Sequence, residues 1–194
     1  MKRFLTGAAA VVIIASSVFI YNIFSPPYLI LRNGDTGKAL AAYPVNEGDE
    51  FSVTFVHSVN RSPVTDVYEI RNGAIYVTRT IYYSFGAGVQ TQIEAGQTLE
   101  YGTDGSMVVS GFERRMDHLS YIVGTVSDHI LKVGGESVSL RNLCGRNTTV
   151  GFRCGPRLVI MLRHISDLFR TRLRLGIGLT HFTKEDYTCL NRKT

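Results

Sequence analysis

Residues 51–71 read FSVTFVHSVNRSPVTDVYEIR, and this stretch predicts a β-hairpin. Side chains alternate along a strand, so the apolar stripe of the first strand ends at His57. With residues 60–63 as the connecting loop, His57 faces Asp66 across the hairpin. Directly opposed residues have Cβ atoms roughly 4.5–5.5 Å apart. The hairpin therefore predicts a hydrogen-bonded histidine–carboxylate pair beside an aromatic stripe.

Short apolar runs separated by turn residues continue on both sides of this hairpin. We expect strands at residues 28–32, 38–43, 50–59, 64–71, 74–84, 107–111, 119–126, 129–133, 137–140 and 148–153. Turn pairs such as Asn33-Gly34 and Asn72-Gly73 separate them. This spacing predicts an all-β domain over residues 28–153, built as an antiparallel β-sandwich or a barrel-like fold.

The start of the chain is apolar. Residues 4–24 carry no formal charge, and Lys2 and Arg3 precede them. As a helix this segment is about 31 Å long, close to the roughly 30 Å of hydrocarbon in a bilayer. We expect a single transmembrane anchor there, with residues 1–3 in the cytoplasm. A cleaved signal peptide and a buried core helix are the alternatives. Both the anchor and the cleaved signal peptide place residues 28–194 outside the cytoplasm.

The net charge of +5 is concentrated at the C-terminus. From Arg153 onward nine Lys or Arg stand against three Asp or Glu. Apolar residues at three- and four-residue steps predict a basic amphipathic helix in a tail of residues 157–194. That helix is expected either to pack on the sheet or to lie on the membrane surface or a partner. Nucleic acid is a poor interpretation of this charge, because the anchor holds the chain at a membrane.

The three cysteines are Cys144, Cys154 and Cys189, and their spacing excludes a zinc finger. In an oxidising compartment Cys144 and Cys154 form the natural disulfide, which leaves Cys189 spare or able to displace either partner. If the chain stays reduced, all three are small apolar residues.

The His57–Asp66 pair admits three roles. It holds the hairpin together, or it binds a polar ligand or a partner's backbone, or it binds a metal with His129 or Glu69. Glu69 falls on the opposite face of the strand from His57, which counts against it as a ligand. Ser58 also points away from His57, so the two residues are not a nucleophile and its base. No catalytic residue, enzyme class or cofactor follows from the sequence.

A glycine-rich turn, Phe85-Gly86-Ala87-Gly88, follows a long predicted strand. Glycines there indicate a tight corner or a close approach of the backbone to a ligand. We take Gly86, Ala87 and Gly88 as the wall of a binding site that His57 and Asp66 share. The turn is not a phosphate loop, because no helix start or lysine follows in the required pattern.

Several of these blocks together resemble a bacterial family known as domain of unknown function 1850. The similar blocks are His57-Ser58-Val59, Pro63-Val64, the acid at Asp66, the Phe85-Gly86-Ala87-Gly88 turn, and residues 123–129 extending through Leu131. The resemblance covers about residues 28–140. The family's acidic position is usually Glu, so Asp66 has a shorter reach here, and the tail after Pro156 is longer than is typical.

The resemblance implies a function that composition does not. Members are small, exported, membrane-anchored proteins often encoded beside TAXI-type tripartite (TRAP) transporters. We therefore expect an accessory protein of such an uptake system, anchored once in the inner membrane, with its β domain in the periplasm or outside the cell. The expected partner is the transporter permease or the TAXI-type solute receptor. The alternative is a stand-alone exported domain that binds a metal or a small ligand.

Overall fold

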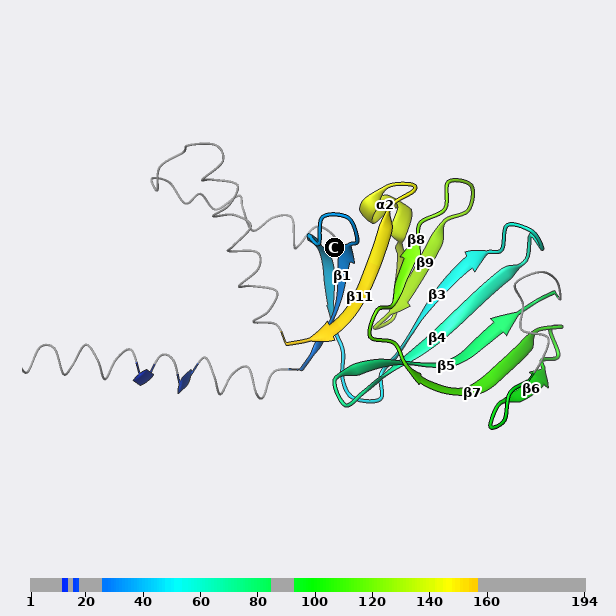
Figure 1. The fold of residues 1–194 in the computed structure, drawn as a ribbon, viewed down its shortest axis with the longest axis horizontal. Coiled ribbons are helices and arrows are strands. Elements are labelled where there is room, and N and C mark those ends of the chain that lie inside the picture. Colours follow the sequence, from blue (N-terminus) through cyan, green and yellow to red (C-terminus); the bar gives the residue numbers. More distant parts are fainter. Residues whose placement is uncertain (1–11, 14–15, 18–25, 85–92, 157–194) are drawn as a thin grey trace, which may run out of the picture. The chain divides into compact units, whose positions relative to one another are not determined.

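A computed structural model of the chain describes residues 12–13, 16–17, 26–84 and 93–156 (Figure 1). These residues belong to one compact unit, Met1–Arg157. The predicted tail helix, Cys189 and the glycine turn at residues 86–88 lie outside the described residues. Most of the expected anchor at residues 4–24 lies outside them too, and its few described positions are helical. Within the described part of the chain, no helix is both long and apolar enough to cross a membrane.

The described strands form two sheets in which every pairing is antiparallel. The smaller sheet has the order β2 (Ala39–Pro44), β1 (Tyr28–Asn33), β11 (Thr149–Gly155), β8 (Ser120–Ile122). The larger has the order β10 (Glu136–Ser139), β9 (His129–Val133), β3 (Glu50–Val56), β4 (Pro63–Arg71), β5 (Ala74–Tyr82), β7 (Met107–Arg115), β6 (Thr98–Tyr101). The prediction of an all-β domain of antiparallel strands is confirmed, and the two separate sheets favour the sandwich over the barrel-like alternative.

The core lies between the facing sides of the two sheets. Phe51 of β3 stacks on Tyr68 of β4 at 5.1 Å and on Phe152 of β11 at 6.1 Å between ring centroids. Fully buried side chains from both sheets surround these rings, among them Leu29, Leu31, Val53, Ile70, Leu131 and Val150. The alternation of apolar residues that predicted the strands is therefore the pattern that fills this core.

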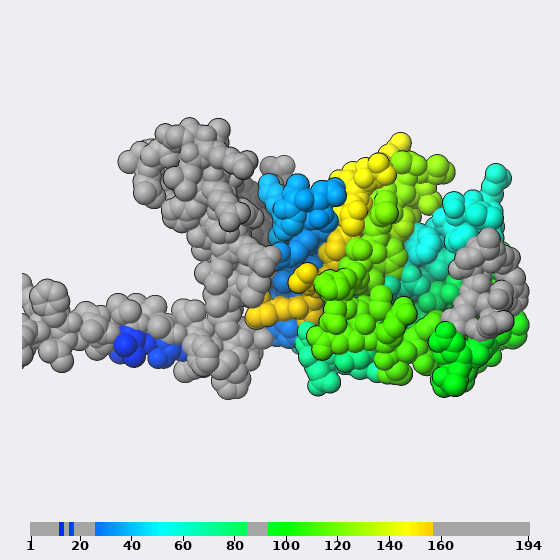
Figure 2. Space-filling view, viewed as in Figure 1, coloured from blue at the N-terminus to red at the C-terminus, as the bar shows by residue number. Residues whose placement is uncertain are grey.

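The smaller sheet does not extend over the whole larger sheet. β1 and β11 lie at one end of the domain, and β6 lies at the other end (Figures 1 and 2). A second apolar cluster, formed by Val64, Tyr82, Met107 and Val109, occupies the inner face of the larger sheet apart from the main core. A cleft lies on the β5–β7 side of the domain, where residues of these strands and of β4 and β8 line it.

Two strand irregularities shape that side. In β5, Thr78 is an extra residue, because Val67 pairs with Arg79 while the next residue of β4 pairs with Val77. The neighbouring β7 has residues 111–113 unpaired at the same level. Gly111 has a φ of +82°, and a Cβ there would lie 2.4 Å from the carbonyl oxygen of Gly96, so this position requires glycine. Bulges of this kind re-aim the side chains that follow them.

The predicted strand boundaries differ from the observed ones in several places, and β6 was not predicted. The strand expected at residues 50–59 ends at Val56. The strand expected at residues 119–126 is only Ser120–Ile122, and the strand expected at 107–111 extends to Arg115. Residue Leu140 begins a short helix, α2 (Leu140–Cys144), in which the Asn142 N–H donates to the hydroxyl of the N-cap residue Ser139.

The predicted Cys144–Cys154 disulfide is not present, because both residues are free thiols. Cys144 ends α2, and its carbonyl oxygen accepts a hydrogen bond from Thr148 Oγ1 at 3.1 Å. Cys154 lies six residues after Thr148, near the far end of β11. At ~3.3 Å per residue along a strand, the two cysteines are much further apart than the roughly 7 Å between Cα atoms that a disulfide tolerates.

Candidate functional site

The β3–β4 hairpin forms, but its register corrects the predicted site. Asp66 lies opposite Val53, not opposite His57, and Val56 pairs with Pro63. The connecting loop begins after His57, because the His57 backbone N–H donates to the Ser62 carbonyl at 2.9 Å. Proline is well tolerated as the first residue of a strand, so Pro63 starts β4 instead of ending the loop. The loop is therefore two residues earlier than predicted.

This shift separates the two predicted partners. Asp66 lies opposite a residue four positions before His57, which corresponds to roughly 13 Å along the strand. His57 instead belongs to its own loop, where its Nδ1 accepts a long hydrogen bond from the Asn60 N–H at 3.4 Å. The predicted His57–Asp66 pair is therefore wrong, and His57 has a structural role in the loop.

Asp66 remains the centre of a polar cluster, with hydroxyl partners in place of the imidazole. Thr80 Oγ1 donates to Asp66 Oδ1 at 2.9 Å, and the Tyr121 hydroxyl donates to Asp66 Oδ2 at 2.7 Å. The Tyr68 hydroxyl lies 2.6 Å from that of Tyr121. Because the one proton of the Tyr121 hydroxyl goes to Asp66, the Tyr68 hydroxyl must donate to Tyr121. The result is a directed relay from Tyr68 through Tyr121 to the carboxylate.

The cluster joins the two sheets. Tyr121 lies on β8 and pairs with Val150, which is fully buried, so its ring points inward from the smaller sheet. Asp66 points inward from the larger sheet because it shares the face of its partner Val53. Thr80 reaches the same face only because the extra residue Thr78 reverses the alternation of β5 between Val77 and Thr80. The bulge therefore supplies one of the two donors to Asp66.

The unpaired residues of β7 bring a cation to the same space. Val77 is a core residue, and its partner across the β5–β7 pairing is Arg114. Since paired residues share a face, Arg114 points to the inner side, while its neighbours Glu113 and Arg115 point outward. Without the irregularity at residues 111–113, Arg114 would face away from the core.

These side chains line a cleft of about 370 Å³ between the sheets. Asp66, Tyr68, Thr80 and Tyr121 form its polar end, and the exposed Arg114 lies at its rim. The remaining wall is mostly apolar and comprises Val77, Tyr82, Phe112, Met116 and Leu119, with Ser120 beside them. Ligand pockets are commonly built this way, with an apolar lining and a few fixed polar groups.

Neither charge in the cleft has an oppositely charged partner within the described residues. Asp66 takes part in none of the ion pairs of this part of the chain, and Arg114 takes part in none either. Burial is the main cause that raises the pKa of Tyr68 and of Tyr121 far above 10, and the negative charge of Asp66 raises both further. The tyrosines are therefore neutral donors at physiological pH and not bases.

His129 is the histidine that lies near this cluster. It pairs with Phe55 on β3, stacks on that ring at 5.1 Å and lies 5.7 Å from the Tyr121 ring. Burial lowers the pKa of His129, an effect that Asp128 opposes and Arg141 reinforces. His57 and His129 were the weak metal candidates, but the described residues contain no group of three or more His, Cys, Asp or Glu side chains placed to hold a metal ion.

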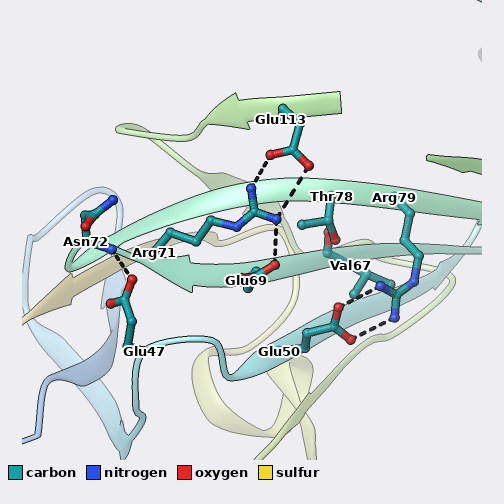
Figure 3. Close-up of polar contacts among 9 residues, drawn as sticks. All are labelled: Glu47, Glu50, Val67, Glu69, Arg71, Asn72, Thr78, Arg79 and Glu113. Atoms are coloured by element: carbon teal, nitrogen blue, oxygen red, sulfur yellow. Dashed lines mark hydrogen bonds and ion pairs between the residues drawn. The ribbon is translucent and has the colours of Figure 1, made fainter. Parts of the chain in front are cut away.

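The outer face of the same strands carries a different arrangement (Figure 3). Arg71 forms ion pairs with Glu69 at 2.7 Å and with Glu113, and Arg79 pairs with Glu50 through both of its terminal nitrogens, at 2.6 and 2.8 Å. Glu69 therefore lies on the outer face of the larger sheet, away from Asp66. These carboxylates are matched by guanidinium groups, so their role is explained within the sheet.

Sequence reasoning found Asp66 but not the residues around it. Tyr68 lies two positions after Asp66 and therefore on the same face, which the alternation rule could have indicated. Thr80 and Arg114 gave no such signal, because bulges reverse the alternation that would have placed them. Tyr121 comes from a three-residue strand in the other sheet, and no local pattern links it to β4.

The comparisons with known proteins give one match. Residues 51–140 match the family described as a domain of unknown function (DUF1850), and this range includes every residue that lines the cleft, together with His57 and His129. Neither a curated protein nor a solved structure is significantly similar to the chain.

Proposed function

Because this chain belongs to the DUF1850 family through its residues 51–140, we propose that it is an accessory protein of a TAXI-type TRAP solute uptake system. In this proposal the chain is anchored once in the inner membrane and the β domain faces the periplasm or the cell exterior. It docks on the permease or on the solute receptor and assists assembly or solute hand-over. The cleft around Asp66 is the site that it uses.

The sequence supports the anchored arrangement in two ways. The uncharged segment at residues 4–24 has the length that a bilayer requires, and the two cations before it favour a cytoplasmic N-terminus. The basic C-terminal tail is proposed to form the amphipathic helix expected from its periodicity, placed against the anionic membrane surface or the transporter.

The observation that carries the functional proposal is the uncompensated carboxylate in a cleft between the sheets. Asp66 is held in position by Thr80 and Tyr121, so its orientation is fixed before anything binds. Pre-positioned polar groups in an apolar cleft serve recognition. The neighbouring tyrosines keep their protons, which favours binding over proton-transfer chemistry at this site.

The test combines association with transport. The full-length chain, purified in mild detergent from its own membranes, is expected to recover permease or receptor subunits. A deletion strain is expected to lose solute uptake, and Asp66→Asn is expected to restore less uptake than the wild-type chain. His57→Ala is the matched control, because His57 lies outside the cleft, and it should restore uptake fully. Recovery of no transporter subunit, with normal uptake in the deletion strain, would reject the proposal.

The cleft also favours a second candidate, a stand-alone exported domain that binds a small ligand. Under this alternative the purified chain binds its ligand without any transporter subunit, and uptake in the deletion strain is normal. Elemental analysis of the full-length protein examines the metal version of this candidate, since stoichiometric zinc or copper would favour it.

A further inference from the structure

The cleft contains one negative and one positive charge that have no oppositely charged partner among the described residues. Asp66 lies at the inner, polar end, and Arg114 lies at the rim. We propose that the cleft binds a small zwitterion of the amino-acid class, with its ammonium group on Asp66 and its carboxylate on Arg114. This inference deepens the proposed function, because it names the class of solute that the accessory protein would hold, and it rests on that function only for the ligand's biological origin.

The hydrogen-bonding capacity of the polar end favours an ammonium group there. A carboxylate offers about four acceptor positions, and Thr80 and Tyr121 occupy two of those on Asp66. Tyr68 donates its proton to Tyr121 and keeps a lone pair. The polar end therefore presents acceptors, and an ammonium group brings three donors and no acceptor.

The charge balance favours a cation over a neutral hydroxyl compound. Half-burying a carboxylate removes part of its hydration, and hydroxyl hydrogen bonds return only part of that loss. On the outer face of the same sheet, by contrast, Glu50 and Glu69 are each paired with an arginine. On the inner face, a ligand cation would give Asp66 the positive charge that the arginines give Glu50 and Glu69 on the outer face.

Arg114 suits the other end of such a ligand. Its guanidinium is a planar fork that binds carboxylates through two parallel hydrogen bonds. The unpaired residues of β7 direct it to the inner face beside Val77, and Gly111 is required for that local backbone. Val77, Phe112, Met116 and Leu119 line the same cleft and offer an apolar wall for the side chain that branches from the carbon bearing both charged groups.

The size of the cleft limits the ligand. Its volume of about 370 Å³ lies near the lower end of the ~300–1,000 Å³ range of small-molecule sites. A single amino acid fits this space, whereas a long peptide would extend beyond the rim.

The experiment is calorimetric titration of the full-length protein in detergent with L-leucine and two analogues that each lack one charge. 3-Methylbutylamine keeps the ammonium group, and 4-methylpentanoate keeps the carboxylate. We expect leucine to bind at least about tenfold more tightly than either analogue. A panel of acidic, basic and aromatic amino acids then defines the preferred side chain. If no amino acid in the panel binds, or if 4-methylpentanoate binds more tightly than leucine, the inference is overturned.

Variants assign the two ends separately. Asp66→Asn should weaken leucine and the amine by about tenfold or more, and Arg114→Gln should weaken leucine while leaving the amine unchanged. Arg115→Gln is the matched control, because Arg115 faces outward and pairs with Asp117, and it should leave both affinities intact. If Asp66→Asn does not fold, the exposed Arg114 variant still decides the proposal. Equal effects of Arg114→Gln and Arg115→Gln on leucine would contradict it.

The binding experiment and the transporter experiment can fail independently of each other. Leucine-class binding without recovery of a transporter subunit keeps this inference and rejects the accessory role. Recovery of the transporter without binding of any amino acid rejects this inference and keeps the accessory role.

Discussion

The inner and outer faces of strands β3 to β5 differ in the groups that bind their carboxylates. On the outer face Glu50 and Glu69 each bind an arginine (Figure 3). On the inner face Asp66 is held only by hydroxyl groups and has no cationic partner within the described residues. The two arrangements lie on opposite sides of one sheet, and successive residues of one strand contribute to both.

The difference indicates where function is to be sought. Exposed ion pairs contribute little to stability, about 0–1 kcal/mol each, and each carboxylate in these pairs contacts a guanidinium group. A half-buried carboxylate without a cation opposes folding unless something else stabilises it. The inner face therefore keeps a feature that stability alone does not explain, and perturbed or unmatched groups of this kind concentrate at binding sites.

The largest effect should come from the aromatic core on the inner face. Phe51→Ala removes the ring that stacks on both Tyr68 and Phe152. We expect the free energy of unfolding to fall by about 3–5 kcal/mol, measured by urea denaturation. Val59→Ala, at an exposed loop position, should change it by less than about 0.5 kcal/mol. Similar values for the two variants would show that these rings do not form the core.

The next effect concerns the relay. Tyr121→Phe removes the hydroxyl that donates to Asp66 and accepts from Tyr68. Because both partners lose a hydrogen bond in a desolvated place, we expect a loss of about 1–3 kcal/mol in the same denaturation assay. Tyr101→Phe is the control, since Tyr101 is 68% exposed. A Tyr121→Phe variant as stable as the control would mean that the relay contributes nothing.

A third effect is a dependence on pH. Burial lowers the pKa of His129 below its ordinary 6.5, so the unfolded chain takes up the proton first as the pH falls. Stability should be constant above about pH 6.5 and decrease as the pH falls from there through the folded-state pKa, by less than about 1.4 kcal/mol per pH unit for one proton. His129→Phe keeps a ring between Phe55 and Tyr121 and should flatten this part of the profile. An unchanged slope would assign the pH dependence to other groups.

The smallest effect should come from the outer face. Glu50→Gln breaks a surface pair with Arg79 whose side chains are 42% and 36% exposed. We expect a change of about 0.2–1 kcal/mol, and a double-mutant cycle with Arg79→Gln should give a coupling that decreases at high salt. A coupling of several kcal/mol, insensitive to salt, would remove the contrast between the two faces.

The sequence was sufficient for the class of fold and for the inward direction of Asp66. Alternation along residues 51–56 and 64–71 predicted both, because apolar positions with a period of two fill the core of a sandwich. The loop position was not predictable from alternation, since shifting the loop by two residues leaves every side chain on its predicted face. The error therefore kept the faces right and put His57 four positions too close to Asp66.

The rest of the cleft depends on long-range geometry. Tyr121 is 55 residues away from Asp66 along the chain and reaches it from the other sheet. Thr80 and Arg114 face the cleft only because the bulges at Thr78 and at residues 111–113 reverse the alternation. Gly111 is the one local sign of such a bulge, and a single glycine in a strand does not indicate in which direction the next side chain turns.

The position of Tyr121 opposite Asp66 has a practical consequence. A molecule bound in the cleft beside these two residues would contact both sheets of the sandwich, and a ligand that binds only the folded form raises the unfolding temperature as its concentration increases. The melting temperature of the unlabelled domain therefore reports the fraction of clefts that hold a ligand. Collections of metabolites can be screened by this measurement before any transporter is purified.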